Sequence, residues 1–265
     1  MEAILSTYFF IAILVVIYMS AVFVASLIFT RNDIADVAWG LGFILVTLAS
    51  LLYNGTFGPR QAIIVVLVTL WGLRLATHIF LRNRGKSEDF RYKKWRQDWG
   101  KQWVVKSYLQ VFLLQGFLLT LIAMPIITLT AIQGPSLRIT DLLGVAVWLV
   151  GFFFETVGDW QLFVFKKNPN NKGKIMTAGL WQYTRHPNYF GEVTMWWGIF
   201  ILALSSPWGM LSIIGPLTIS YLILKVSGIP ILEKKYEGVT AFQEYKRTTS
   251  AFIPWFPKRK IETNP

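Results

Sequence analysis

The chain has 265 residues, of which 54% are hydrophobic and only 15% are charged, and its formal net charge is +12. So much apolar content excludes an ordinary water-soluble domain and favours an integral membrane protein. The sequence holds no cysteine and only two histidines, His78 and His186. That composition excludes disulfides and cysteine nucleophiles, and we expect no metal site.

Taken in chain order, five stretches are long and apolar enough for a membrane-spanning helix, namely 4–29, 34–53, 61–81, 108–132 and 140–165. The first follows Glu2 and lacks a basic leader, so it predicts a retained span and not a cleaved signal. Residues 188–225 are also apolar, but Ser205-Ser206-Pro207 predicts a turn between a short sixth and a short seventh span. The expected fold is therefore an all-α polytopic membrane protein of about seven helices.

Lysine and arginine residues gather in alternate loops. Twenty-three of the 26 lie at Arg31, in loops 82–106 and 166–187, and from Lys225 onward. Cytoplasmic loops hold the excess of positive charge in membrane proteins. We therefore expect the N-terminus outside and the C-terminus in the cytoplasm, most simply across a bacterial inner membrane. This distribution of positive charge among the loops also argues against nucleic acid as a partner, because nucleic-acid binding requires a basic face on a soluble module.

The expected organisation is a single membrane domain over 1–265, with cytoplasmic loops 82–106 and 166–187 and a basic tail, 226–265. Within the first loop, Trp95, Trp99 and Trp103 recur at a spacing of four residues. This spacing predicts an amphipathic helix that contacts membrane lipid. We expect the protein to be a monomer.

Several polar residues fall within the predicted spans, where each must find a partner or a wet cavity. They are Asp33 and Asp36 in the second span, Arg74 and His78 in the third, Glu155 and Asp159 in the fifth, and Asn188 and Glu192 in the sixth. One interpretation is structural, with Arg74 neutralising Asp36 or Asp159. The other is a polar cavity that opens toward the cytoplasm, which the excess of acids favours.

The fifth span and the loop after it carry groups suited to a ligand with an anionic part. Glu155, Asp159, Leu162 and Lys166 share one helix face. Pro187 suits the first turn of a helix, whose unpaired N–H groups beside Arg185 and His186 would suit a phosphate. A membrane-interface cap is the alternative interpretation of this Arg-His-Pro sequence.

Gly179 to Glu192, with Asp159 one helix earlier and Ala251-Phe252-Ile253-Pro254 near the end, resembles the C-terminal half of the steroid 5α-reductase family. Asn83-Arg84-Gly85 and Glu88-Asp89-Phe90-Arg91-Tyr92 look like a bacterial branch of that superfamily. The resemblance implies NADPH bound within a seven-helix bundle and reduction of the carbon–carbon double bond of an enone in a sterol-like, lipophilic substrate.

The resemblance also implies roles for single residues. Asp159, Asn188 and Glu192 would contact the nicotinamide and ribose end of NADPH, with Glu155 beside them. Lys166 would bind phosphate, one turn after Leu162. The remaining residues of the cofactor channel would be Asn83, Arg84, Arg185, His186 and Tyr189.

In this family a carboxylate of the second span and a tyrosine of the third polarise the enone. Asp36 matches the carboxylate, whereas the third span has no tyrosine and offers Trp71, Arg74 and His78 instead. We expect a protonated Asp36 or His78 to donate a hydrogen bond to the substrate carbonyl, with Trp71 nearby.

The element Arg-His-Pro-x-Tyr-x-Gly also resembles that of isoprenylcysteine carboxyl methyltransferases and phospholipid methyltransferases, where it serves S-adenosylmethionine. Two alternatives to a reductase therefore stay open: an S-adenosylmethionine-dependent membrane methyltransferase, and a non-enzymatic lipid-binding protein.

Overall fold

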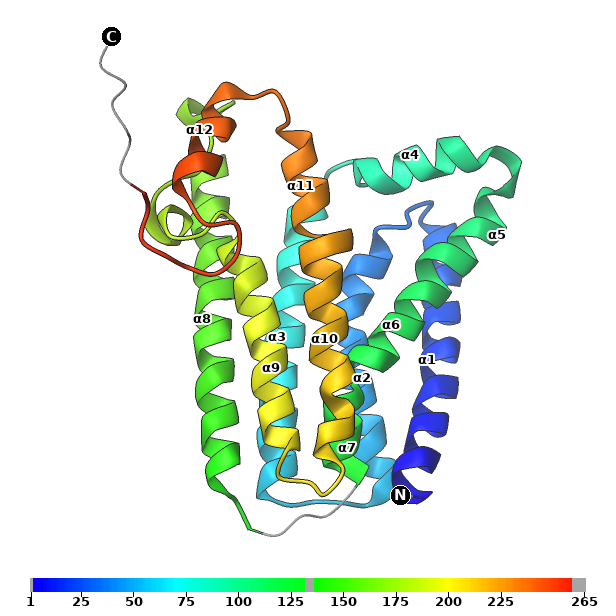
Figure 1. Ribbon diagram of the computed structural model, residues 1–265. Coiled ribbons are helices and arrows are strands. Elements are labelled where there is room, and N and C mark those ends of the chain that lie inside the picture. Colours follow the sequence, from blue (N-terminus) through cyan, green and yellow to red (C-terminus); the bar gives the residue numbers. More distant parts are fainter. Residues whose placement is uncertain (1, 132–135, 259–265) are drawn as a thin grey trace. The chain divides into compact units, whose positions relative to one another are not determined.

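A computed structural model describes residues 2–131 and 136–258, and within these ranges the regular structure is helical (Figure 1). Ile132, the last residue of the predicted fourth span, and residues 259–265 of the predicted tail lie outside the described residues.

Six helical stretches of the described chain are long and apolar enough to cross a membrane, so the protein is an integral membrane protein. They are Glu2–Ile28, Ile34–Asn54, Pro59–Asn83, Phe90–Ile122, Ile139–Lys167 and Gly209–Lys235. The predicted sixth span corresponds to α9 (Pro187–Ala203), whose 17 residues extend about 26 Å. The all-α membrane fold is thus confirmed, whereas the count of seven and the orientation stay predictions.

The chain divides into two compact units. Unit 1 comprises residues 1–141 and 200–215, and unit 2 comprises residues 142–199 and 216–265. That all of them form a single domain stays a prediction.

In unit 1, α2 (Ile34–Asn54) packs against α1 (Glu2–Ile28), α3 (Pro59–Asn83) and α7 (Met124–Ala131). Close packing on α3 depends on Gly40 and Gly72, because a Cβ atom on Gly40 would lie 2.6 Å from the carbonyl oxygen of Gly72. Near the start of α3, Arg60 and Asp141 form a buried two-point ion pair with both contacts at 2.7 Å. Burial of both charges requires such paired geometry.

The fourth helical stretch of unit 1 begins earlier than predicted. It runs through α4 (Phe90–Trp99), α5 (Trp103–Ser107), a π-helical turn (Tyr108–Leu113) and α6 (Leu114–Ile122). Figure 1 shows α4 turned away from the direction of α5 and α6. Trp95 stacks on Trp99, and Arg96 lies over the ring of Trp103, so the predicted helical spacing of these tryptophans holds within a helix that changes direction at Gly100.

In unit 2, α8 (Ile139–Lys167) and α9 approach closely through matched glycines. A Cβ atom on Gly151 would lie 2.6 Å from the carbonyl oxygen of Gly191, and one on Gly198 would lie 2.8 Å from that of Gly144. Small residues at such positions let the backbones of membrane helices touch. The glycines are seven residues apart on each helix, so the contact runs along two turns.

The predicted helix start at Pro187 and the predicted interruption at Ser205-Ser206-Pro207 are both confirmed, since α9 ends at Ala203 and residues 204–208 form turns. Beyond the turns lie α10 (Ile214–Tyr221), α11 (Ile229–Lys235) and α12 (Thr240–Thr248). The predicted tail 226–265 therefore contains two helices, and α12 buries Phe242 and Tyr245.

Candidate active site

In unit 1, the chain after α3 folds back onto the residues that precede α2. Asp33 is 2% exposed and receives two contacts from Arg31, at 2.8 and 3.0 Å. The backbone N–H of Asp89 and the side-chain amide of Asn83 also donate to Asp33, at 3.2 and 3.5 Å. Asp33 thus joins the loop 84–89 to the start of the second span.

One turn further along α2, Asp36 accepts two hydrogen bonds from α4. The Tyr92 hydroxyl donates to it at 2.5 Å, and the Arg91 guanidinium donates at 3.0 Å as an ion pair. Tyr92 is 3% exposed, and the side-chain amide of Gln115 donates to its hydroxyl oxygen at 3.3 Å. Asp36 therefore joins the start of α2 to Arg91 and Tyr92 of α4.

Local structure at the start of α4 directs these two side chains. Asp89 caps the helix, accepting from the backbone N–H of Arg91 at 3.0 Å, and its carboxylate also receives the Arg91 side chain. Burial raises the pKa of the Asp89 carboxyl, but the hydrogen bonds from Arg91 and the charges of Arg91 and Arg82 together outweigh burial and hold this pKa below its ordinary value. The cap therefore fixes Arg91 and, with it, the neighbouring Tyr92.

The other predicted residues of unit 1 lie along α3. Trp71 is 2% exposed and packs edge-on against Phe43, with ring centres 5.4 Å apart. His78 is half-buried two turns later. The side-chain amide of Asn83 donates to Asp33, whereas Arg84 is exposed at the end of the helix.

In unit 2, glycine packing brings α8 and the start of α9 together at two predicted cofactor residues. A Cβ atom on Gly158 would lie 3.1 to 3.3 Å from atoms of Pro187 and Asn188. The next residue, Asp159, accepts a hydrogen bond of 3.1 Å from the side-chain amide of Asn188. The structure thus pairs an acid and an amide that stand 29 residues apart in the sequence.

The neighbouring predicted residues continue along the same helices. Glu155 is 3% exposed one turn before Asp159, and the uninterrupted helix carries Leu162 and the exposed Lys166 one and two turns after it. On α9, Tyr189 and Glu192 are half-buried. The predicted helical spacing of the stripe on α8 is therefore confirmed.

Arg185 and His186, predicted to line a cofactor channel, both bind Glu233 of α11. The Arg185 guanidinium contacts it at 2.8 and 2.9 Å and His186 Nε2 at 3.2 Å, with Lys246 of α12 at 3.1 Å. Both predicted residues are nearly buried, at 6% and 5% exposed. The group holds the start of α9 to α11 and α12, and the expected cofactor contact stays a prediction.

Further hydrogen bonds fix the segment before α9. The Tyr245 hydroxyl donates to the carbonyl of Trp181, and the Thr184 hydroxyl donates to the carbonyl of Phe252 at 2.8 Å. Burial raises the pKa of Tyr245 well above its ordinary value. The phenol therefore stays protonated as a donor.

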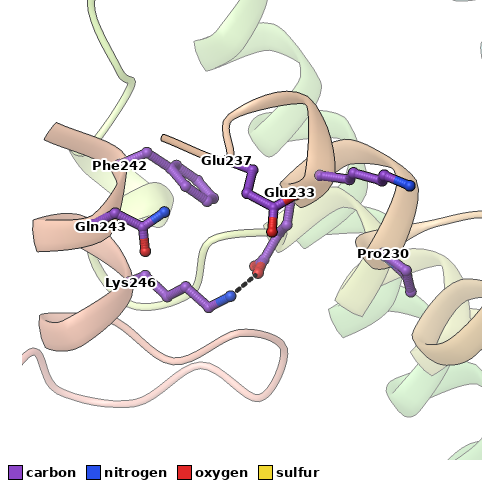
Figure 2. Close-up of a pocket in the computed structure, with 7 residues that line it drawn as sticks. Pro230, Glu233, Glu237, Phe242, Gln243 and Lys246 are labelled. Atoms are coloured by element: carbon purple, nitrogen blue, oxygen red, sulfur yellow. Dashed lines mark ion pairs between the residues drawn. The ribbon is translucent and has the colours of Figure 1, made fainter. Parts of the chain in front are cut away.

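A pocket of about 510 Å³ lies beside this group, between α11 and α12 (Figure 2). It is lined by Pro230, Glu233, Lys234, Glu237, Phe242, Gln243 and Lys246. Figure 2 shows the Lys246 ammonium directed at Glu233 across one side of the pocket.

Sequence reasoning missed Tyr92, Gln115 and Glu233. Tyr92 could have been predicted as a site residue. Asp89 before Phe90-Arg91-Tyr92 is a helix-start signal, and it lies in a loop that resembles the reductase superfamily. Glu233 offered no such signal, since two of its partners, Arg185 and His186, lie 48 and 47 residues away.

Comparisons with known proteins give two partial matches. A 3-oxo-5-alpha-steroid 4-dehydrogenase 1 from Mus musculus is 32% identical over 114 residues, which cover 43% of this chain and 42% of that protein. A probable O-methyltransferase ustE from Ustilaginoidea virens is 47% identical over 53 residues, or 20% of this chain and 18% of that protein. This chain therefore spans less than half the length of either relative. No solved structure matches.

The match to the mouse protein supports a distant similarity to steroid 5α-reductases, while the bacterial branch stays a prediction. A family model described as "Protein of unknown function (DUF1295)" matches residues 22–249, which is most of the chain. The protein therefore belongs to the DUF1295 family.

Proposed function

We propose that this protein is a membrane-embedded, NADPH-dependent reductase of the carbon–carbon double bond of an enone in a sterol-like or other lipophilic substrate. The observation that carries the proposal is the pair of donors, Tyr92 and Arg91, on the carboxylate of Asp36. The partial match to the mouse 3-oxo-5-alpha-steroid 4-dehydrogenase supports the same class of reaction.

The chemistry assigned to unit 1 is polarisation of a carbonyl. When a hydride adds to the β-carbon of an enone, negative charge develops on the carbonyl oxygen, and a positioned donor stabilises that charge. Tyr92 supplies a hydroxyl of the kind that the third span lacks. A phenol has one proton to donate, so on substrate binding this hydroxyl would turn from Asp36 to the carbonyl oxygen, and Asp36, held by Arg91, would position Tyr92. A proton from solvent would complete the reduction at the α-carbon. His78 is the second candidate donor, and Trp71 a candidate wall residue.

The residues of unit 2 fit a dinucleotide. An amide beside a carboxylate presents both donors and acceptors, as Asn188 and Asp159 do, and this set suits a carboxamide and ribose hydroxyls. Glu155 and Glu192 add acceptors, and the exposed Lys166 is a cation suited to phosphates, as is Arg84 of unit 1. NADPH, when bound, supplies the hydride. The residues we propose to hold it are Asn83, Arg84, Glu155, Asp159, Leu162, Lys166, Arg185, His186, Asn188, Tyr189 and Glu192.

Nucleotide binding tests the proposal directly. Purified protein in detergent is titrated with NADPH, NADH and S-adenosylmethionine while its thermal stability is followed. We expect NADPH to stabilise the protein, and Asp159→Ala or Glu192→Ala to weaken NADPH binding by about 1 to 3 kcal/mol, the scale for losing a buried hydrogen-bond partner. Glu244→Ala, which removes an exposed acid of the same unit that does not line the pocket, is the control. Unchanged NADPH affinity in both site variants would reject the assignment.

A methyltransferase is the second candidate, favoured by the match of 53 residues to the probable O-methyltransferase. Stabilisation by S-adenosylmethionine and not by NADPH would establish it in place of the reductase. Stabilisation by neither would favour the non-enzymatic, lipid-binding alternative.

A further inference from the structure

The segment after α12 exposes three large apolar side chains in a short distance. Ile253 is 63% exposed, Trp255 71% and Phe256 78%. Pro254 and Pro257 flank the two aromatic residues, and residues 254–258 have no helical structure. Proline restrains the backbone and prevents a helix from forming there, so the aromatic side chains remain exposed.

Backbone contacts hold this segment against the chain before α9. The N–H of Trp255 donates to the carbonyl of Tyr183 at 2.9 Å, and the rings of Phe256 and Tyr183 meet edge-on. The N–H of Lys258 donates to the carbonyl of Thr248 at 2.9 Å. The segment is therefore a fixed part of unit 2, beside the end of α8 that leads to Lys167 (Figure 1).

The level of this segment along the axis of α8 follows from the neighbours of Tyr183. The N–H of Leu180 donates to Gln161 at 2.9 Å, and the indole of Trp181 donates to the carbonyl of Gly158 at 3.1 Å. Deeper still, the ring of Phe252 packs on Phe190, which packs on Phe154 of α8. The segment thus sits beside a part of α8 that lies inside a predicted span.

At this level the outer surface of α8 is still apolar. Trp160 is 62% exposed, Phe163 56% and Val164 48%, and only then do Lys166 and Lys167 follow. Exposed apolar side chains of a membrane-spanning helix face lipid, and the first lysines after them mark the headgroup region. Trp255 and Phe256 therefore stand at the boundary between acyl chains and headgroups.

Charge complements this position. Lys258 follows the aromatic pair, Lys166 and Lys167 end α8, and the sequence continues with Arg259-Lys260. Basic residues next to aromatic ones are attracted to anionic lipid at the cytoplasmic surface. We propose that residues 253–258 form a membrane-interface anchor, with Ile253, Trp255 and Phe256 inserted among acyl chains and Lys258 on anionic headgroups.

The absence of cysteine from the sequence gives a clean test. Phe256→Cys and, separately, Ile253→Cys are labelled with an environment-sensitive fluorophore and reconstituted into vesicles of phosphatidylcholine alone or with phosphatidylglycerol. Ala241→Cys, at an exposed position of α12 that does not line the pocket, is the matched control. At residues 253 and 256 we expect blue-shifted emission, quenching by lipids spin-labelled near the headgroup, and protection from aqueous iodide. The label on the control should show no blue shift, no quenching by lipid, and strong quenching by iodide.

The contribution of charge is measured with Lys258→Gln in the Phe256→Cys background. Loss of this basic charge should increase iodide quenching of the label at residue 256 in phosphatidylglycerol vesicles, and change it little in phosphatidylcholine alone. Iodide quenching at 253 and 256 equal to that of the control, with no quenching by lipid, would overturn the anchor. Protection that appears only at high protein-to-lipid ratio would also overturn it, because a second copy would then cover the segment.

Discussion

At the scale of single residues, the hydroxyl of Tyr92 is the group whose removal tests the proposed chemistry most directly. Tyr92→Phe keeps the buried ring but leaves the carbonyl oxygen without its donor. Removing one such donor typically lowers turnover by roughly 100- to 1,000-fold. We expect a fall of that order in reduction of an enone such as a 3-oxo-4-ene steroid, with NADPH affinity nearly unchanged.

Substitutions of Asp36 belong to the same test. Asp36→Ala should abolish reduction, whereas Asp36→Asn still accepts from Tyr92 and should retain some activity. The control is Tyr108→Phe, which removes a hydroxyl bonded to Ser20 at 2.9 Å in the same helical stretch. Normal turnover in Tyr92→Phe or Asp36→Ala would refute the catalytic role. Loss of folded protein in both Asp36 variants would point to a structural ion pair instead.

Asp89 makes the cap of α4 sensitive to acid. Because its folded-state pKa lies below the unfolded value, the carboxylate stabilises the fold above the unfolded pKa of about 3.9, and this contribution is lost as the pH falls through the folded pKa. Asp89→Asn can still cap the helix but does not titrate. Between about pH 5 and about pH 3, the thermal midpoint of the wild type should therefore fall further than that of Asp89→Asn. Parallel curves for the two proteins would show that Asp89 contributes nothing.

Sequence reasoning found residues that need a partner but missed the partners themselves. Asp36 and Asp159 stood out because a charge within a span needs a partner. Which partner each one takes depends on chain folding over 29 to 56 residues, so Asn188 was paired with Asp159 only in the structure, and Tyr92 with Asp36. Arg185 and His186 matched a phosphate-binding pattern, yet their bonds to Glu233 depend on α11, which the sequence presented as tail.

At the scale of elements, the contact between α8 and α9 makes a graded prediction. A Cβ atom on Gly191 would overlap the backbone N of Glu155 and the carbonyl oxygen of Gly151, which cannot move aside. At Gly158 the nearest atom is a ring carbon of Pro187 at 3.1 Å. Gly191→Ala should therefore lower stability by about 1 to 3 kcal/mol or more, and Gly158→Ala by less. Thermal unfolding in detergent measures both, and equal losses would show that the glycine contact is not tight.

Element boundaries were predictable wherever proline or apolar length decides them. Pro187 opens α9, and the serines with Pro207 end the apolar run, as local backbone chemistry requires. The start of the fourth stretch at Phe90 was not predicted as part of a span, because Lys93, Lys94 and Arg96 mask its continuity with α5 and α6. The polar helix α12 escaped detection because its stability comes from burying Phe242 and Tyr245 and not from apolar length.

At the scale of the whole molecule, hydropathy and charge carry different information. Apolar length predicted an all-α membrane protein, and the six long apolar helices confirm it. The residues proposed for NADPH binding include Asn83 and Arg84 in unit 1 and Glu155 to Glu192 in unit 2. Asn83→Ala and Asp159→Ala are each measured in the NADPH titration, and unchanged affinity in either variant would remove that residue from the proposed set.

Orientation across the membrane is the last prediction, and it depends on charge alone. With an odd number of spans, the two ends of the chain lie on opposite sides, and the loops rich in lysine and arginine stay in the cytoplasm. A reporter fused after Pro265 should therefore be active on the cytoplasmic side, and one inserted at Pro135, which also lies outside the described residues, should be active on the other. If α9, with its 17 residues, did not cross, the chain would have six spans and its ends would share a side. A third reporter after Glu2 distinguishes these cases: reporters after Glu2 and Pro265 on the same side would reject the seven-span topology.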